Sequence, residues 1–177
     1  HSTSDILGSF AGVRPLYDDH TGVASKVSRE YHLQCDVIDD KLPIIHVVGG
    51  KLTTYRHVAE EVVNRLQPFF PEVGSGWTKT AVFPGSDWGD KDEQRCRQDF
   101  FSHYSGLNQG LLTRLWKSHG MSAYAVLGDA KEPSDLGVEI LPGLHAKEVA
   151  HYTENEWVVT ASDLLWRRTK LGLEYNE

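Results

Sequence analysis

The stretch with the clearest chemical potential runs from residue 44 to residue 56 and reads IIHVVGGKLTTYR. A short apolar run meets Gly49 and Gly50, and apolar residues at helical spacing follow directly. Glycines let the backbone approach a ligand closely, and the first turn of a helix presents unpaired N–H groups at its positive end. Lys51 adds a full positive charge there. The sequence therefore predicts a site for a negatively charged group, such as a phosphate or the pyrimidine edge of a reduced flavin.

Two arginines stand in apolar surroundings nearby in the sequence. Arg14 interrupts an apolar stretch, and Arg29 alternates with apolar residues. A buried arginine is costly without a carboxylate or phosphate partner, so both side chains are candidates for anion binding. If their strands are neighbours, the two planar guanidinium groups converge on one pocket and fit a phosphate. The alternatives are a structural salt bridge for Arg14 and, for Arg29, an exposed strand position paired with Glu30 or an aspartate.

The glycine motif also has plainer interpretations. Two glycines at a strand–helix junction often serve only a tight turn, and Lys51 can be a solvated lysine at a helix start. A cation there is unfavourable by about 0.3–1 kcal/mol because of the helix dipole, and an anionic ligand would remove that conflict. The chain contains no Ser-His-Asp pattern, no Cys-x-x-Cys and no Gly-x-Gly-x-x-Gly, so we assign no catalytic residue.

The first third of the chain must hold these residues in place. Residues 9–17 read as extended, because Pro15 discourages a helix. Residues 27–35 alternate as a half-buried strand does. A turn at residues 39–41 leads into a third strand at 43–48, and the helix that follows Lys51 ends near Leu66.

The remainder reads as a linker followed by helices. Residues 68–89 are rich in Pro, Gly and Ser, yet their aromatic residues should pack on a surface (Phe69, Phe70, Trp77, Phe83, Trp88). From residue 90, apolar stripes recur at helical spacing (Cys96, Phe100, Tyr104; Leu111, Leu112, Leu115, Trp116, His119; Ala146, Val149, Ala150, Thr153, Trp157). Asn108 is a predicted N-cap, and Thr160 with Asp163 resembles a capping box. The fold class expected is α+β, with an incomplete domain at 1–67 (short strands and one long helix), the linker at 68–89 and a small all-helical domain at 90–177.

Composition narrows the function further. The 177 residues carry a net charge of −7 without a basic block, which argues against a nucleic-acid binder. No apolar run approaches the roughly 20 residues of a membrane helix. Met121 is the only methionine, so we expect a trimmed part of a longer chain. None of the nine histidines has a familiar ligand spacing, so we expect no metal site, and Cys35 and Cys96 read as two buried free thiols, with one disulfide as the alternative.

Several segments together resemble one enzyme family. The segments are SFAGVRPLYDD, SREY, VVGGKLTTYRHVAEEV, WTKTAVFPGSDW, LGDAKEPSDLG and TASDLLWRRTKLGL, and they span nearly the whole chain. They resemble the C-terminal part of the FAD-dependent glycerol-3-phosphate dehydrogenases. The resemblance implies an incomplete FAD and substrate domain followed by the helical domain. It also implies oxidation of sn-glycerol 3-phosphate to dihydroxyacetone phosphate, with electrons passed to quinone.

The resemblance assigns roles to particular residues. Arg14 and Arg29 match the arginines that contact the substrate, Arg29 gripping its phosphate. The residues that match the segment facing the flavin ring are Gly49, Gly50, Lys51, Leu52 and Thr53. Lys51 is therefore expected near both substrate and flavin, in agreement with the anion site predicted from the residue types. Since the glycine-rich motif for the FAD pyrophosphate is absent, the chain alone is expected to bind no FAD and to be inactive.

The resemblance also implies a cellular location, and two alternative functions remain. We expect a bacterial-type enzyme on the cytoplasmic, inner face of the plasma membrane, peripherally bound, because no EF-hand calcium loop appears. A homodimer is among the partners to test. One alternative is a sister oxidase that passes electrons to oxygen. An alternative of another class is a non-catalytic role for residues 90–177 in docking or oligomerisation.

Overall fold

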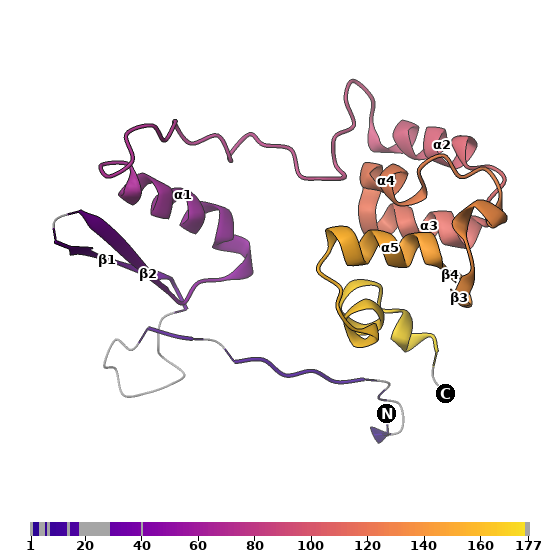
Figure 1. The fold of residues 1–177 in the computed structure, drawn as a ribbon, viewed down its shortest axis with the longest axis horizontal. Helices are drawn as coiled ribbons and strands as arrows, with labels where there is room; N and C mark the ends of the chain where they lie inside the picture. Colours follow the sequence, from indigo (N-terminus) through magenta and orange to yellow (C-terminus); the bar gives the residue numbers. More distant parts are fainter. Residues whose placement is uncertain are drawn as a thin grey trace. The chain divides into compact units, whose positions relative to one another are not determined.

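The computed structural model describes residues 2, 3, 6, 8–13, 15–17, 29–39 and 41–175 (Figure 1). The chain divides into two compact units. One unit comprises Phe10–Ala81, and the other comprises Val82–Glu177 together with His1–Ser9. The described residues form five α-helices and two sheets of two strands each. This mixture confirms the predicted combination of helices and strands.

An antiparallel hairpin dominates the unit of Phe10–Ala81. Strands β1 (His32–Ile38) and β2 (Leu42–Val48) pair so that His32 faces Val48 and Ile38 faces Leu42. The chain reverses at Asp39, whose φ is 51°, and the Lys41 N–H donates to the Ile38 carbonyl at 3.1 Å. The turn and the strand at 43–48 were thus predicted correctly.

The other predicted strands need correction. Of the strand expected at 27–35, residues 27 and 28 lie outside the described residues. Residues 29–31 form no strand, and pairing begins at His32, because β2 ends at Val48 and the next residues, Gly49 and Gly50, have positive φ angles that break the ladder. Residues 9–13 and 15–17 form no strand, since no strand partner lies beside them in the part of the chain that the structure describes.

Helix α1 (Tyr55–Leu66) follows a 3₁₀ turn at Leu52–Thr54 and ends where the sequence predicted. Its polar side chains fasten it to the hairpin. The Tyr31 hydroxyl donates to Glu61 at 2.6 Å, and Arg65 donates both to Glu61 at 2.8 Å and to the Leu33 carbonyl at 2.9 Å. The hydrogen bonds from Tyr31 and Arg65 lower the pKa of Glu61 and keep it ionised as their acceptor.

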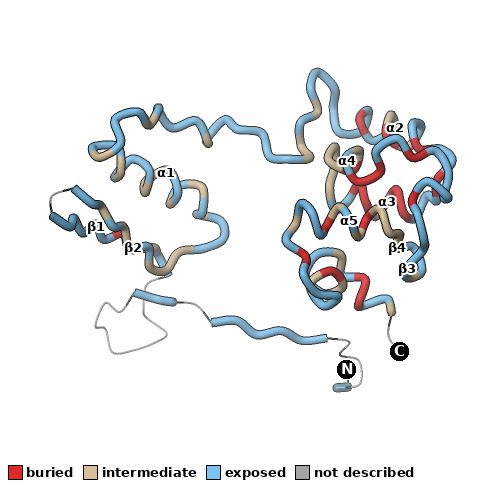
Figure 2. The backbone as a smooth tube through the Cα atoms, viewed as in Figure 1, coloured by how far each residue is buried: buried red, intermediate tan, exposed pale blue. Residues whose placement is uncertain are grey.

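This first unit has almost no interior of its own. Within its described residues, Leu33 is the single buried hydrophobic side chain (Figure 2). Many large apolar side chains are instead exposed (Phe10, Val13, Leu16, Tyr17, Val37, Ile38, Leu42, Ile44, Val47, Leu52, Tyr55, Val63, Phe70, Trp77). A soluble domain rarely leaves so much contiguous apolar surface uncovered. The exposed surface favours burial against further protein.

The unit that begins at Val82 contains the other helices. Its elements are α2 (Glu93–His103), α3 (Gln109–His119), α4 (Ala123–Leu127), β3 (Glu139–Leu141), β4 (Leu144–His145) and α5 (Ala146–Asn155), with short 3₁₀ turns at Gly120–Ser122, Pro133–Leu136 and Leu171–Leu173 and a π-helical segment at Asp163–Arg168. The β3–β4 hairpin corrects the expectation of an all-helical domain. The chain reverses there because Gly143, after Pro142, adopts a φ of 73°.

Two apolar clusters hold this unit together. The larger packs α2, α3 and α4 around Phe100, Tyr104, Leu112 and Leu115, which confirms the predicted stripes on α2 and α3. The Tyr104 hydroxyl donates to the Gly128 carbonyl at 2.7 Å, and burial raises the pKa of Tyr104 to about 12. The smaller cluster joins α5 to the C-terminal segment (Leu144, Tyr152, Val158, Leu164, Leu171).

The predicted caps are confirmed. The Asn108 side chain accepts from the N–H groups of Gly110 and Leu111, at 2.8 and 3.2 Å, and so begins α3. The Thr160 N–H donates to the Asp163 carboxylate at 2.9 Å, and the Asp163 N–H donates to the Thr160 hydroxyl at 3.2 Å. This reciprocal pair is the geometry of a capping box.

The stripe predicted on α5 is wrong. Its buried side chains are Glu148 and Tyr152, whereas Ala150 and Thr153 are exposed and Trp157 lies beyond the helix. Glu148 can be buried on this face because its carboxylate pairs with Arg114 on α3, so the buried face is not marked by apolar residues alone. The pattern of apolar residues therefore followed the wrong face of the helix.

The structure also bears on the linker aromatics, the two cysteines and the expected absence of a membrane helix. Of the linker aromatics, Trp88 packs against Trp116 with ring centroids 5.8 Å apart, whereas Phe70, Trp77 and Phe83 are exposed. Both cysteines are free, as expected, but Cys35 is exposed and only Cys96 is buried. Among the described residues, no helix combines the length and the apolar character that crossing a membrane requires.

Candidate functional site

The predicted site residues of the first unit gather at the turn between β2 and α1. Gly49 has a φ of 79° and Gly50 a φ of 98°, values that side-chain-bearing residues rarely adopt. A Cβ atom on Gly49 would lie 2.8 Å from the Glu30 carbonyl oxygen and 3.7 Å from the Pro15 carbonyl oxygen. Glycine at this position therefore lets three separate backbone segments meet beside the helix start.

This geometry makes Gly49→Ala an informative change. The left-handed conformation costs an alanine about 1–2 kcal/mol, and the close approach to Glu30 adds a clash. We expect the free energy of local opening of the β1–β2 hairpin to fall by about this amount, as measured by amide hydrogen exchange. Gly74→Ala is the matched control in the same unit, since its Cβ would meet no atom within 4 Å. Equal protection in both variants would contradict the assignment.

Lys51 lies at the tip of the helix, as predicted. Its ammonium donates to Glu30 at 2.5 Å, and both side chains are largely exposed. The Thr54 hydroxyl accepts from the Lys51 N–H at 3.1 Å and donates to the Lys51 carbonyl at 3.0 Å. This local network fixes the backbone of the first turn, where the leading N–H groups have no acceptor within the helix. The pair with Glu30 offsets the unfavourable position of the lysine charge.

Arg29 is exposed beside this turn, one residue before Glu30. Its guanidinium makes no hydrogen bond or ion pair with the described residues, so the alternative of a pair with Glu30 or an aspartate has no support there. Arg14 lies outside the described residues. Lys51 directly follows the glycine turn, and Arg29 precedes Glu30, whose carbonyl oxygen approaches Gly49. The convergence of Arg29 with Arg14 stays a prediction.

A hollow of about 530 Å³ opens next to the turn. It is lined by Gly49, Gly50 and Lys51 at one end and by apolar side chains of β2 and α1 along its wall (Val47, Tyr55, Val58, Ala59, Val62, Val63). Bare backbone, a helix start and one cation at the rim with an apolar wall behind them suit a planar ring with an electron-rich edge. The residues present thus fit the pyrimidine edge of a flavin. Leu52, also expected to face the flavin, is almost fully exposed, and Thr53 is exposed beside it.

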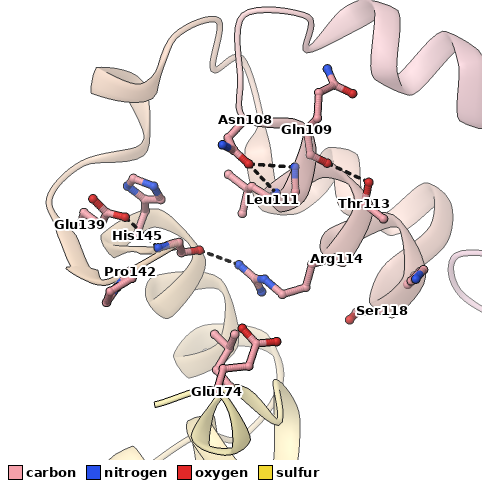
Figure 3. Close-up of a pocket in the computed structure, with 14 residues that line it drawn as sticks. Asn108, Gln109, Leu111, Thr113, Arg114, Ser118, Glu139, Pro142, His145 and Glu174 are labelled. Carbon is pink, nitrogen blue, oxygen red and sulfur yellow. Dashed lines mark hydrogen bonds between the residues drawn. The ribbon is translucent and has the colours of Figure 1, made fainter. Parts of the chain in front are cut away.

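The helical unit carries a larger groove, of about 840 Å³, between α3 and the β3–β4 hairpin (Figure 3). Its principal cation, Arg114, is already engaged, because it donates to both oxygens of Glu148 and to the Gly143 carbonyl. Glu139 and Glu174 add negative charge to the lining. An anionic substrate would have to displace a buried carboxylate there, so this groove is a poor phosphate site.

One cluster of polar side chains was not predicted from the sequence. His119, His151 and Glu156 place their ligand atoms within 4.8 Å of one another, although no familiar metal-binding spacing joins them. They come from the end of α3, the middle of α5 and the residue that ends α5. Only the packing of α3 against α5 brings them together, which is why the expectation of scattered histidines missed them.

The chain matches one protein family and several individual proteins. Residues 77–177 match the family described as the C-terminal domain of alpha-glycerophosphate oxidase. The chain is 40% identical to a glycerol-3-phosphate dehydrogenase of Pseudomonas aeruginosa over 172 residues, covering 97% of this chain and 33% of that protein. It is 36% identical to the aerobic glycerol-3-phosphate dehydrogenase of Escherichia coli K12 over 176 residues, covering 99% of this chain and 35% of that protein.

A relative named for a different substrate also matches. The D-erythritol 1-phosphate dehydrogenase of Brucella abortus is 35% identical over 173 residues, covering 98% of this chain and 34% of that protein. The chain is thus similar to proteins named as dehydrogenases of two different phosphorylated polyols. The chain belongs to the family of the alpha-glycerophosphate oxidase C-terminal domain. It spans about a third of the length of the relatives it matches.

Proposed function

We propose that this chain forms the C-terminal part of an FAD-dependent enzyme that oxidises sn-glycerol 3-phosphate to dihydroxyacetone phosphate and passes the electrons to quinone at a membrane surface. The observation that carries the proposal is the Gly49–Gly50–Lys51 turn at the start of a helix, together with an exposed Arg29 that has no ion-pair partner among the described residues. The relatives named as glycerol-3-phosphate dehydrogenases align with 97–99% of the chain.

Each residue has a physical role in this proposal. Arg29 binds the substrate phosphate, for which a guanidinium offers two parallel donors. Lys51 and the first N–H groups of Leu52 and Thr53 lie where negative charge develops on the cofactor, and the glycines keep that edge free of side chains. FAD supplies the acceptor for the hydride that leaves C2 of the substrate. The group that takes the hydroxyl proton is unassigned.

The proposal explains the bare surface of the first unit. The exposed apolar side chains of the β1–β2 hairpin and α1 would be covered by the rest of a flavin and substrate domain. The chain by itself should therefore bind no FAD and show no turnover. A purified 177-residue chain that is yellow with flavin would contradict this part of the proposal.

The function is tested by steady-state assays of the full-length protein. We expect turnover of sn-glycerol 3-phosphate with a soluble quinone analogue, and a much smaller rate with oxygen as the acceptor. Since one relative is named for D-erythritol 1-phosphate, both phosphates are compared at equal concentration. Preference for oxygen would support the oxidase alternative, and preference for the erythritol phosphate would overturn the substrate assignment.

Arg29→Ala tests the phosphate site in the same assay. Loss of a charge-assisted hydrogen bond costs about 1.5–3 kcal/mol, so the KM for sn-glycerol 3-phosphate should rise about ten- to a hundredfold. Arg29→Lys should recover part of the loss, because it keeps the charge but not the planar fork. Lys79→Ala removes another exposed cation of the same unit and serves as the control. An unchanged KM in Arg29→Ala would rule out the phosphate role.

A further inference from the structure

Three metal-ligating side chains meet where helices α3 and α5 end. His119 is the last residue of α3, His151 lies on α5, and Glu156 caps the C-terminal end of α5. The His119 Nδ1 lies 3.6 Å and the His151 Nε2 lies 3.9 Å from the same oxygen, Oε1, of Glu156. The exposed fractions of the three side chains are 7%, 14% and 32%, so the cluster is shielded yet reachable from solvent.

We propose that His119, His151 and Glu156 bind a divalent transition-metal ion, with Zn²⁺ the best match. Two imidazoles and one carboxylate form a three-residue set that zinc uses with a water in the fourth position. At ligand distances of about 2.0–2.2 Å, the donor atoms of a tetrahedral ion lie about 3.4 Å apart. The two histidine–glutamate separations are 3.6 and 3.9 Å, and all three ligand atoms lie within 4.8 Å of one another, so side-chain movements of about 1 Å would close the set on an ion.

The surroundings of His119 favour the ligating form of its ring. Its Nε2 lies 2.8 Å from the Tyr152 hydroxyl, so a proton on Nε2 leaves the Nδ1 lone pair directed at the cluster. A hydrogen-bond partner of this kind on the second ring nitrogen is the usual support for a metal-bound histidine.

Glu156 is likewise positioned by its neighbours. Its N–H donates to the Tyr152 carbonyl at 3.0 Å, and its own carbonyl accepts from the Arg168 Nε at 2.9 Å. The Arg168 Nε also lies 3.9 Å from Oε2, whereas Oε1 faces the two histidines. The carboxylate thus directs one oxygen toward Arg168 and the other toward the two histidines.

A bound ion would link the two apolar clusters of this unit. The C-terminal end of α3 belongs to the cluster around Phe100, and Tyr152 on α5 belongs to the cluster with Leu164 and Leu171. An ion held by both helices stabilises the folded chain by mass action, since the unfolded chain holds no assembled site. This inference does not depend on the flavin proposal, and its test needs no enzymatic activity.

The test is a titration of the metal-free 177-residue chain with Co²⁺, whose visible absorbance reports tetrahedral coordination, followed by displacement with Zn²⁺. We expect one saturable equivalent and a rise in melting temperature with Zn²⁺. His151→Gln and Glu156→Gln should each weaken binding more than about tenfold while circular dichroism shows a retained fold. His46→Gln is the control, because His46 pairs with Asp36 in an exposed histidine–carboxylate contact outside the cluster.

Three results would overturn the proposal. The first is the absence of saturable Co²⁺ binding to the wild-type chain. The second is binding that survives in both His151→Gln and Glu156→Gln, and the third is binding that falls equally in His46→Gln. In each case His119 and Glu156 would form only a hydrogen-bonded and ionic cluster that ends the two helices.

Discussion

Replacing Phe100 by alanine is expected to lower the free energy of unfolding of the helical unit by about 3–5 kcal/mol. Phe100 is 0% exposed, and its ring centroid lies 5.0 Å from that of Tyr104, 5.1 Å from that of Tyr124 and 5.2 Å from that of Trp116. Removing the ring loses its transfer free energy and leaves a cavity that three rigid aromatic neighbours cannot fill. Helices α2, α3 and α4 would lose their common contact.

The measurement is urea denaturation of the 177-residue chain, followed by tryptophan fluorescence and circular dichroism. Phe83→Ala is the matched control, because this phenylalanine belongs to the same unit but is 62% exposed, and its change should stay within about 0.5 kcal/mol. If Phe100→Ala were as mild as Phe83→Ala, the central packing of α2 against α3 would be wrong.

The second large effect is expected for Glu148→Ala, at about 3–5 kcal/mol. Glu148 is 4% exposed and accepts two parallel hydrogen bonds from Arg114, at 2.5 and 2.7 Å. Removing the carboxylate leaves the guanidinium, whose side chain is only 20% exposed, with the Gly143 carbonyl as its remaining acceptor in this group. An uncompensated charge in such a place costs more than the pair itself contributes.

A double variant separates these two contributions. Arg114→Met with Glu148→Leu removes both charges and keeps apolar volume, so it should destabilise the chain less than Glu148→Ala alone. Glu154→Ala, an exposed glutamate on the same helix, is the control and should change stability by less than about 0.5 kcal/mol. A Glu148→Ala chain as stable as the Glu154→Ala chain would show that the ion pair does not hold α5 against α3.

The elements that local chemistry determines were predictable from the sequence. Asn108 predicts the start of α3 because its side chain caps the first turn. The four-residue spacing of Cys96, Phe100 and Tyr104 identifies the buried face of α2. The hairpin and α1 followed from the turn residues and the apolar periodicity around Gly49–Gly50. These signals lie within a few residues of the structure that they determine.

The features that depend on distant partners were not predictable in this way. The buried face of α5 was not predicted because Glu148 can be buried only when Arg114 pairs with it. The residues of α5 alone give no sign of this partner on α3. The metal-ligating cluster depends in the same way on how His119 meets α5. Which apolar side chains of the first unit are exposed could not be predicted either, since periodicity marks an apolar face but not whether another element covers it.

For the candidate site, the structure bears on the arrangement of the predicted residues, and their role in binding stays a prediction. The turn, the helix start and Lys51 lie together as expected, and Arg29 is exposed and available. The ion pair between Lys51 and Glu30 was not foreseen, because an adjacent glutamate gave no sign that it would reach the helix tip. A substrate or cofactor that uses Lys51 must share it with Glu30.

The most direct test of the account is anaerobic mixing of the full-length protein with sn-glycerol 3-phosphate while the absorbance of oxidised flavin is recorded. The account predicts that the wild-type protein bleaches with this substrate but not with unphosphorylated glycerol, and that Arg29→Ala requires a much higher substrate concentration for the same bleaching. A protein without flavin, or one that Arg29→Ala leaves equally responsive, would contradict the claim that Arg29 and the Gly49–Lys51 turn serve a single site.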